Sequence, residues 1–329
     1  MMVGPVIIVA GPTASGKSEL GLKLAKRFGG VVVNADSLQV YRELRILTAR
    51  PDAKSETEVS HRLYGVVPVA ERFSVGQWLS MAQHEIDSIH SAGDVPIFVG
   101  GTGLYLDGLI NGIADIPEVS AKVRSAATKL YEHIGGMAFK ARLAERDPKT
   151  AARINSGDRQ RLVRAWEVLE GTGRSISDWQ KGNGIGGLSS PFLVLKIMPQ
   201  RTKLYRQCDA RFERMLADGV LNEVVAAESL NLDSSLPAMK ALGMQALFSH
   251  LRGQASLEDT RQKVCQATRN YAKRQYTWFR NRLVADLEVG DPVSSEGEIL
   301  ETVARFLLTA SNQTISVAPL PGTPNVGKS

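Results

Sequence analysis

The sequence contains few cysteines and no long apolar run. Its 329 residues include only Cys208 and Cys265, which argues against a disulfide framework and favours a reducing, cytoplasmic compartment. No CxxC pair or paired-histidine spacing occurs, so a structural zinc site is not expected. No apolar stretch reaches the roughly 18 residues of a membrane-spanning helix. The short apolar segment Val6 to Ala10 follows no basic residues, so we expect neither a signal peptide nor a membrane partner.

The chain has a modest deficit of acidic residues. It carries 40 Lys and Arg against 34 Asp and Glu, a formal net charge of +6. This excess is compatible with a polyanionic partner but does not identify one. The segment from Thr260 to Arg282 is more specific, because it contains basic residues interleaved with aromatic ones and no Asp or Glu. Two interpretations remain open: a solvated basic helix face, or a surface that binds RNA phosphates.

Apolar strand-like segments alternate with helical patterns in the first hundred residues. We predict strands at residues 5–10, 31–34, 66–69 and 95–99, and helices at residues 17–28 and 75–92. This alternation predicts an α/β fold with a P-loop NTPase-like, doubly wound parallel sheet. Ligands of such sheets bind beyond the carboxyl ends of the strands. Asp36 and Thr102 fall at two of these ends, and a glycine-rich loop falls at a third.

The pattern changes near residue 116, where helical segments rich in Ala, Arg and Lys begin. A glycine-rich stretch at 182–187 is typical of a turn or hinge, and residues 192–197 read as a strand that returns to the sheet. We therefore predict four parts: a first part of the core at 1–115, a helical insertion at 116–190, a second and mostly helical part of the core at 191–311, and a disordered tail at 312–329.

The strongest single motif is a phosphate-binding loop. It matches GxxxxGK[ST], directly after a predicted strand and before a predicted helix. Glycines permit the tight backbone, successive N–H groups point at phosphate, the lysine adds charge and the final hydroxyl suits Mg²⁺. We expect a diphosphate cradle, with Ser18 as the metal ligand, formed by Gly11, Pro12, Thr13, Ala14, Ser15, Gly16, Lys17 and Ser18. The loop alone does not distinguish a nucleotide from another diphosphate.

Further sequence blocks resemble one family, in its order. They read NADSLQVYR at 34–42, TARP at 48–51, VGGTGLY at 99–105, DRQRLVRA at 158–165 and TRNYAKRQYTWF at 268–279. With the phosphate loop, these blocks are similar to those of the tRNA dimethylallyltransferase family, the isopentenyltransferases that act on tRNA. The resemblance covers about residues 5–283. No Cys/His finger of the kind found in some eukaryotic relatives follows, so the resemblance is to the bacterial type.

The resemblance implies an activity and roles for particular residues. The family transfers a dimethylallyl group from dimethylallyl diphosphate to N6 of adenosine 37 in tRNA, with Mg²⁺, and a monomer is implied. Asp36 would accept a proton from the amine, and Lys17, Thr102 and Arg211 would stabilise the leaving diphosphate. Alternatives remain for each role. Asp36 could be a metal ligand or helix cap, Thr102 a helix cap and Arg211 a surface ion pair, with Arg206 and Arg214 as rivals.

The resemblance also implies contacts with the anticodon arm of tRNA. An adenine must leave its stack before its amine can react, and single-stranded loops are read by stacking and base-edge contacts. The implied tRNA-binding residues are Asp36, Ser37, Leu38, Gln39, Thr102, Arg124, Arg159, Gln160, Arg161, Leu162, Val163, Lys240, Gly243, Gln245, Lys273, Arg274 and Arg280. For each arginine, plain solvation at the surface is the competing interpretation. Met244 stands where the family commonly has Tyr, so one local contact is expected to differ.

Other functions compete with this one. A related prenyltransferase acting on free adenine nucleotides would share the loop and Asp36, but it would need neither the insertion nor the basic aromatic run. A small-molecule kinase would share the α/β core, yet it fits the blocks at 34–42 and 99–105 poorly. An RNA-binding module without catalysis would leave the phosphate loop without a purpose.

Overall fold

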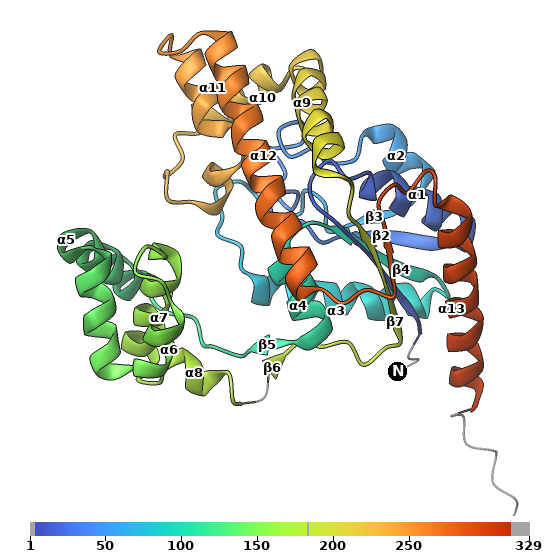
Figure 1. Cartoon of the computed structure of the whole chain (residues 1–329), viewed down its shortest axis with the longest axis horizontal. Helices are drawn as coiled ribbons and strands as arrows, with labels where there is room; N and C mark the ends of the chain where they lie inside the picture. The colour runs from blue at the N-terminus through green and yellow to red at the C-terminus, as the bar shows by residue number, and fades with distance from the viewer. Residues whose placement is uncertain (1–3, 183, 317–329) are drawn as a thin grey trace, which may run out of the picture. The chain divides into compact units, whose positions relative to one another are not determined.

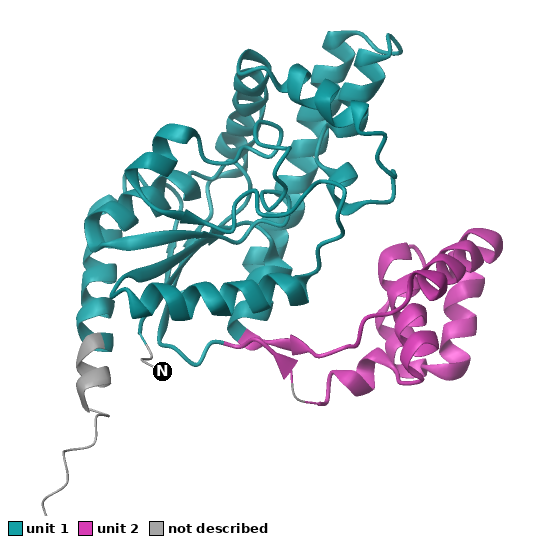
Figure 2. Cartoon of the chain, turned by 180° about the vertical axis from the view of Figure 1, so that it is seen from behind, with its two compact units in different colours: residues 1–110, 188–329 teal, residues 111–187 magenta. Residues whose placement is uncertain are grey.

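The computed structural model describes residues 4–182 and 184–316, with only the backbone described for residues 311–316. The chain forms two compact units, shown in Figure 2. Unit 1 runs to Ile110 and resumes at Leu188, and unit 2 is Asn111–Gly187. Unit 2 overlaps residues 116–187 of the insertion that the sequence suggests, and it starts earlier because it includes a short strand, β5 (Ile113–Ala114).

Unit 1 is built on a six-stranded sheet with the order β3-β2-β4-β1-β7-β8, in which every pairing is parallel (Figure 1). The strands are β1 (Val6–Ala10), β2 (Gly30–Asn34), β3 (His61–Arg62), β4 (Val95–Gly100), β7 (Phe192–Ile197) and β8 (Leu287–Val289). All five residues of β1 are buried, as expected for a parallel strand covered on both faces. The predicted α/β fold with a doubly wound parallel sheet is confirmed.

Two strand predictions need correction. The strand predicted at 66–69 is wrong, because β3 lies at His61–Arg62 and Val67 forms only an isolated bridge to Tyr41. Pro68 follows Val67 and has no N–H to continue a ladder. Strand β8 was not predicted, since its three residues read Leu-Glu-Val and give no apolar run. It nevertheless pairs with β7 at the edge of the sheet.

Helices cover this sheet and extend beyond it. They are α1 (Lys17–Phe28), α2 (Ala53–Glu58), α3 (Val75–Ser91), α4 (Gly103–Asn111), α9 (Arg201–Ala217), α10 (Val220–Ser229), the 3₁₀ turn Pro237–Lys240, α11 (Met244–Leu251), α12 (Leu257–Arg282) and α13 (Glu296–Ser316). Leu20 and Leu24 of α1 pack with β-strand residues and with Ile299 of α13 in one core cluster. Helix α13 continues to Ser316, so residues 312–316 are helical and not an irregular tail. The rest of the predicted tail, 317–329, lies outside the described residues.

Unit 2 has a core of its own. Its helices are α5 (Ala121–Arg146), α6 (Pro148–Arg153), α7 (Arg159–Thr172) and α8 (Ile176–Trp179), and β5 pairs antiparallel with β6 (Gly184–Ile185). Phe139 packs against Trp166 at the centre, with ring centroids 5.5 Å apart. Gly135 interrupts α5 with a φ of 75°, a backbone conformation that glycine adopts without strain. Unit 2 is therefore a small helical bundle, and the two strands that precede and follow its helices, β5 and β6, pair with each other.

Other expectations concern covalent links and membranes. Cys208 and Cys265 are buried and unbonded, as the absence of a disulfide framework predicts. In the part of the chain that the structure describes, no helix has the length and apolar character needed to span a membrane.

Candidate active site

The phosphate loop connects β1 to α1 as a tight, concave turn. A Cβ at Gly11 would lie 2.7 Å from the carbonyl oxygen of Ile197, so only glycine fits there. Ala14 and Gly16 both adopt positive φ angles, 63° and 90°. Such left-handed residues turn successive N–H groups toward the inside of the loop, where the N-terminus of α1 adds its positive dipole. The backbone is thus shaped to bind an anion.

Lys17 is buried beneath this loop. Its side chain is 8% exposed, and its Nζ donates a hydrogen bond to the carbonyl of Pro12 at 3.2 Å. Burial and, to a lesser extent, the nearby Arg211 guanidinium lower the pKa of Lys17 to about 8, against the opposing effect of the Asp36 carboxylate. A bound anion would favour the charged form again. An anion bound in this loop would therefore be stabilised by the charge of Lys17.

Two serines of the loop differ in their surroundings. The hydroxyl of Ser15 is buried and has no hydrogen-bond partner among the described residues. Buried polar groups normally have a partner, so this hydroxyl is expected to acquire one from a ligand. Ser18 is exposed on the first turn of α1. No group of three or more His, Cys, Asp or Glu side chains suited to a metal occurs within residues 4–182 and 184–316. Any metal here would depend on phosphate oxygens and water for most of its ligands.

Asp36 follows β2 and Thr102 follows β4, and these strands are neighbours in the sheet. The Thr102 hydroxyl accepts a hydrogen bond from the backbone N–H of Ser37 at 2.9 Å and donates one to the Ser37 hydroxyl at 3.2 Å. One carboxylate oxygen of Asp36 accepts from the N–H of Leu38 at 3.0 Å. Asn34 accepts from the N–H of Asp36 at 2.8 Å. The Thr102 side chain thus bonds to the loop of Asp36, and the carboxylate is held in one orientation.

Three glycines bring separate segments together beside Thr102. A Cβ at Gly100 would lie 2.1 Å from the carbonyl oxygen of Ala35, next to Asp36. One at Gly101 would lie 2.5 Å from Gln275, and one at Gly103 would lie 2.5 Å from the ring of Trp278. Real Cβ atoms do not approach this closely, so the sequence Gly-Gly-Thr-Gly is needed for α12 and the Asp36 loop to meet here.

Gln275 of α12 links two of the site's loops. Its Oε1 accepts a hydrogen bond from the N–H of Thr13 at 2.8 Å, and its Nε2 donates one to the carbonyl of Gly101 at 2.7 Å. The side chain is 6% exposed. Sequence reasoning missed this residue. Helical spacing could have indicated it. Residues four apart lie on the same face of a helix, so the aromatic residues Tyr271 and Phe279 place Gln275 on the buried face of α12.

Arg211 of α9 contacts the phosphate loop directly. Its guanidinium donates a hydrogen bond to the Thr13 hydroxyl at 2.9 Å. Burial lowers the pKa of Arg211, although a guanidinium stays charged in proteins. The rivals Arg206 and Arg214 are both exposed on the same helix. Among the three arginines, the structure therefore brings Arg211 to the loop.

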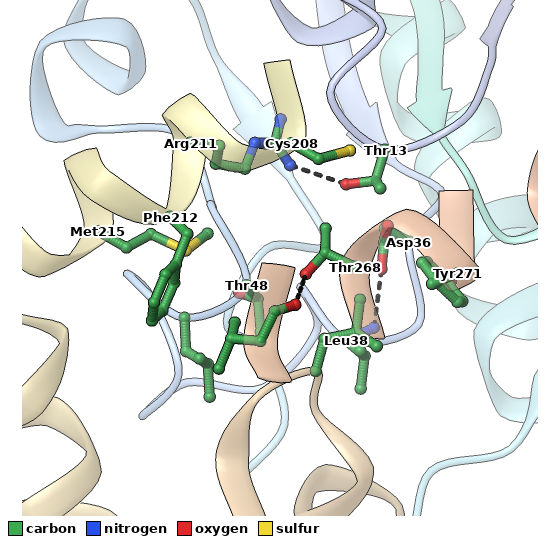
Figure 3. A pocket seen from close by; sticks show the side chains of 13 residues that line it. Thr13, Asp36, Leu38, Thr48, Cys208, Arg211, Phe212, Met215, Thr268 and Tyr271 are labelled. Atoms are coloured by element: carbon green, nitrogen blue, oxygen red, sulfur yellow. Dashed lines mark hydrogen bonds between the residues drawn. The ribbon is translucent and has the colours of Figure 1, made fainter. Parts of the chain in front are cut away.

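A cavity of about 50 Å³ lies between these elements (Figure 3). Since one water-sized group occupies about 10–15 Å³, it has room for roughly four such groups. Its lining consists of Thr13, Asp36, Leu38, Leu47, Thr48, Cys208, Arg211, Phe212, Met215, Leu242, Val264, Thr268 and Tyr271. In Figure 3, Arg211 points to Thr13, Asp36 lies beside Tyr271, and Phe212 and Met215 lie together along α9. Burial and the Asp36 carboxylate raise the pKa of Tyr271, so its phenol is neutral.

The apolar part of this lining was not predicted from the sequence. Cys208, Arg211, Phe212 and Met215 follow the i, i+3, i+4, i+7 spacing that places residues on one face of a helix. Once Arg211 is placed at a diphosphate, this spacing predicts the other three as its neighbours. Leu47 and Leu242 come from loops distant in the sequence, and no comparable spacing connects them to Arg211.

The predicted tRNA-binding residues of unit 1 fall into two groups. Ser37, Leu38 and Gln39 follow Asp36 directly, and the Gln39 amide nitrogen donates to the carbonyls of Thr48 and Ala49, both at 2.9 Å. The second group consists of exposed side chains, together with Gly243 at the start of α11: Lys240, Gln245, Lys273, Arg274 and Arg280. Met244, noted as unusual in the sequence, is fully buried, so its side chain faces the core.

A groove of about 270 Å³ lies between α4 and α12. It is lined by Gly101, Gly103, Leu104, Arg274, Gln275, Trp278 and Phe279. Leu104 is 56% exposed, so it adds apolar surface to this groove. The groove therefore combines apolar and aromatic surface with a cation.

The predicted tRNA-binding residues of unit 2 are placed differently from one another. Arg159, Gln160 and Arg161 are exposed on the first turn of α7, and Arg159 pairs with Glu132 at 2.6 Å. Leu162 and Val163 are buried in the helical core, so only their backbone atoms are available to RNA. Arg124 is half-buried and lies 3.5 Å from Glu118.

Comparisons with known proteins identify the family of the chain. The family model described as IPP transferase matches residues 39–282, and the model described as isopentenyl transferase matches residues 4–70. A tRNA dimethylallyltransferase of Rhodospirillum centenum is 52% identical over 286 residues, which cover 85% of this chain and 90% of that protein.

Solved structures of the same family are also similar to this chain. The tRNA isopentenylpyrophosphate transferase of Bacillus halodurans is 29% identical with a TM-score of 0.66, over 94% of this chain and 99% of that one. A eukaryotic dimethylallyltransferase acting on tRNA is 26% identical with a TM-score of 0.77, over 97% of this chain and 81% of that one. The chain therefore belongs to the IPP transferase family, that of the tRNA dimethylallyltransferases.

Proposed function

We propose that this enzyme transfers the dimethylallyl group of dimethylallyl diphosphate to N6 of adenosine 37 in tRNA and releases diphosphate. The observation that carries the proposal is a single cavity bounded by Thr13 of the phosphate loop, Arg211 and Asp36. A diphosphate in the loop, a cation above it and a carboxylate beside it are the groups that this substitution requires.

The reaction exchanges one bond to carbon for another. The N6 lone pair forms a bond to C1 of the donor while the C1–O bond breaks, and the electron pair of that bond leaves with diphosphate. The amine loses a proton, which the Asp36 carboxylate accepts. Leu38 N–H holds one oxygen of Asp36, so the other oxygen is available to the amine. This orientation favours the role of general base over that of a helix cap.

Charge develops on the diphosphate as it leaves. We assign Lys17, Arg211 and the inward N–H groups of the phosphate loop to that charge, because groups fixed before the reaction stabilise it without reorganising. We also assign the Thr102 hydroxyl to the diphosphate, which requires its proton to turn away from the Ser37 hydroxyl that now accepts it. The unpartnered hydroxyl of Ser15 is a further candidate to contact phosphate.

Mg²⁺ fits the residues present. The Ser18 hydroxyl is an oxygen ligand on the first turn of α1, and Mg²⁺ in such loops takes its other ligands from phosphates and water. When bound, the ion would neutralise part of the negative charge on the diphosphate.

The RNA side of the proposal rests on exposed cations. Lys273, Arg274 and Arg280 lie on α12, and Arg274 also lines the groove that contains Trp278. Cations beside aromatic surface suit single-stranded RNA, whose bases stack while its phosphates pair with the cations. We propose that α12 and, in unit 2, Arg159 and Arg161 bind the anticodon arm, and that one chain suffices for activity.

The test is transfer of radiolabel from dimethylallyl diphosphate, with Mg²⁺, to unmodified tRNA carrying adenosine at positions 36 and 37. AMP and ATP serve as parallel acceptors. We expect label in tRNA alone. Label in the free nucleotides would favour a nucleotide prenyltransferase. No label, together with hydrolysis of ATP, would overturn the proposal in favour of a kinase.

A further inference from the structure

The cavity of the candidate active site changes character along its length. Thr13, Asp36 and Arg211 provide polar groups at one part of its wall. Leu47, Phe212, Met215, Leu242 and Val264 provide the apolar part, and the hydroxyls of Thr48 and Thr268, which also line the cavity, already donate to backbone carbonyls. Phe212 is 2% exposed and Leu47 5% exposed, so this wall is backed by the core of the protein. The proposed function uses the polar groups and leaves the apolar ones without a role.

The chemistry of the donor explains the apolar wall. A diphosphate held by the loop places the reacting carbon near Asp36, and the hydrocarbon chain must continue into the remaining space. An adenine ring carries nitrogens that need hydrogen-bond partners, and the side chains of Phe212, Met215 and Leu242 offer none. A branched hydrocarbon needs no partners and gains free energy by leaving water. The apolar part of the cavity therefore suits the chain and not the base.

We propose that Met215 and Leu242 set the length of the prenyl chain that this enzyme transfers, by closing the apolar part of the cavity. This inference rests on the proposed function. The cavity has room for about four water-sized groups, close to the size of one isoprene unit. A second unit has no space unless the wall recedes. Protein interiors resist such movement because they are closely packed.

The two residues differ from Phe212 in how safely they can be changed. Phe212 is fully buried, so its truncation would endanger the fold. Met215 and Leu242 are only half-buried. Alanine is the best helix former, so Met215→Ala keeps α9 intact. Leu216 is the matched control, since it is the next residue of α9, is also half-buried and does not line the cavity.

The experiment compares dimethylallyl diphosphate with geranyl diphosphate, which is one isoprene unit longer, using tRNA as acceptor. For the wild type, Met215→Ala, Leu242→Ala and Leu216→Ala, kcat/KM is measured for each donor. We expect the geranyl-to-dimethylallyl ratio of kcat/KM to rise by about tenfold or more in the first two variants, since single methylenes discriminate by about 10- to 200-fold. Leu216→Ala should keep the wild-type ratio.

A variant that enlarges a lining side chain keeps the inference testable even if the alanine variants fail to fold. Leu242→Phe should fill the cavity and lower kcat/KM for dimethylallyl diphosphate by about tenfold, while the Kd of inorganic diphosphate stays unchanged. An unchanged donor ratio in both alanine variants would overturn the inference, as would a change in the KM of tRNA alone, which would place the base in this cavity. If wild-type enzyme transferred no dimethylallyl group to tRNA, the proposed function itself would fail, independently of these ratios.

Discussion

The phosphate loop of unit 1 and the first turn of α7 in unit 2 both present groups suited to phosphate, yet they are built in opposite ways. Around the loop, Lys17 and Gln275 are buried and fixed by hydrogen bonds to backbone atoms. On α7, Arg159 and Arg161 are exposed and pair with single surface carboxylates. Buried, fixed groups stabilise developing charge strongly, whereas exposed ion pairs contribute little. Changes in the two regions should therefore differ in size and in the kinetic constant affected.

The largest effect should come from Asp36→Asn. The amide can still accept the hydrogen bond from Leu38 N–H, but it cannot accept a proton from the amine. We expect kcat to fall by roughly 10²–10⁴-fold, the usual contribution of a general base. Single-turnover transfer to tRNA measures this. Asp94→Asn, in an exposed turn, is the control. A loss under tenfold would mean that Asp36 is not the base.

Gln275→Leu tests whether the buried hydrogen bonds beside the phosphate loop contribute to kcat/KM for the donor. The change leaves Thr13 N–H and the Gly101 carbonyl without their partners. An unsatisfied buried group costs about 1–3 kcal/mol, so kcat/KM for the donor should fall about ten- to a hundredfold. Gln266→Leu, exposed on the same helix, is the matched control. An equal fall of kcat/KM in Gln275→Leu and Gln266→Leu would show that the hydrogen bonds of Gln275 have no particular role at the loop.

Lys17 should make donor binding sensitive to pH. Its pKa of about 8 means that Lys17 is mostly unprotonated in the free enzyme above that pH. Binding of diphosphate must then be accompanied by the uptake of one proton from the solvent onto Lys17. The Kd should rise by up to about tenfold per pH unit above about pH 8. Calorimetry in buffers of different ionisation enthalpy measures the proton uptake. Lys17→Arg, which does not titrate in this range, should abolish the dependence.

The same lysine should make the folded state more stable as the pH rises, whereas it makes donor binding weaker. Its pKa lies below the ordinary 10.5, so between about pH 8 and 10.5 the unfolded chain binds more protons than the folded one. The free energy of unfolding contributed by this group therefore rises with pH in that interval. Denaturant titrations of the wild type and Lys17→Met at both ends of the interval isolate the contribution. A wild-type slope equal to that of Lys17→Met would contradict it.

The smallest effect should come from Arg159→Ala. The ion pair with Glu132 is exposed, so the free energy of unfolding should change by less than about 1 kcal/mol. If Arg159 contacts an RNA phosphate, the KM of tRNA should rise a few-fold and the salt slope of binding should fall by about 1, while the KM of the donor stays constant. Arg153→Ala, exposed elsewhere in unit 2, is the control. An unchanged salt slope would leave Arg159 as a solvated surface residue.

The sequence was most informative where local physics determines the structure. The strand at 6–10 is a continuous apolar run, that at 192–197 is apolar apart from Lys196, and the phosphate loop has a fixed spacing, so all three could be predicted. The choice of Arg211 over Arg206 and Arg214 depends on which face of α9 meets Thr13, and only tertiary contacts decide that. The burial of Leu162 and the link from Gln275 to Thr13 also depend on packing between segments that no local pattern connects.

The short ladder of β5 and β6 has a consequence for how such an enzyme can be rearranged. Ile113 and Ile185 face each other there, at the entrance and exit of the helical bundle. Neighbouring antiparallel residues lie only about 5 Å apart, a gap that a two-residue turn closes. To the sheet domain, the whole bundle is therefore equivalent to a hairpin loop, and the entropy of closing a loop grows only slowly with its length. A bundle of another size or sequence can be exchanged at this point while the strand pairings of the sheet stay the same.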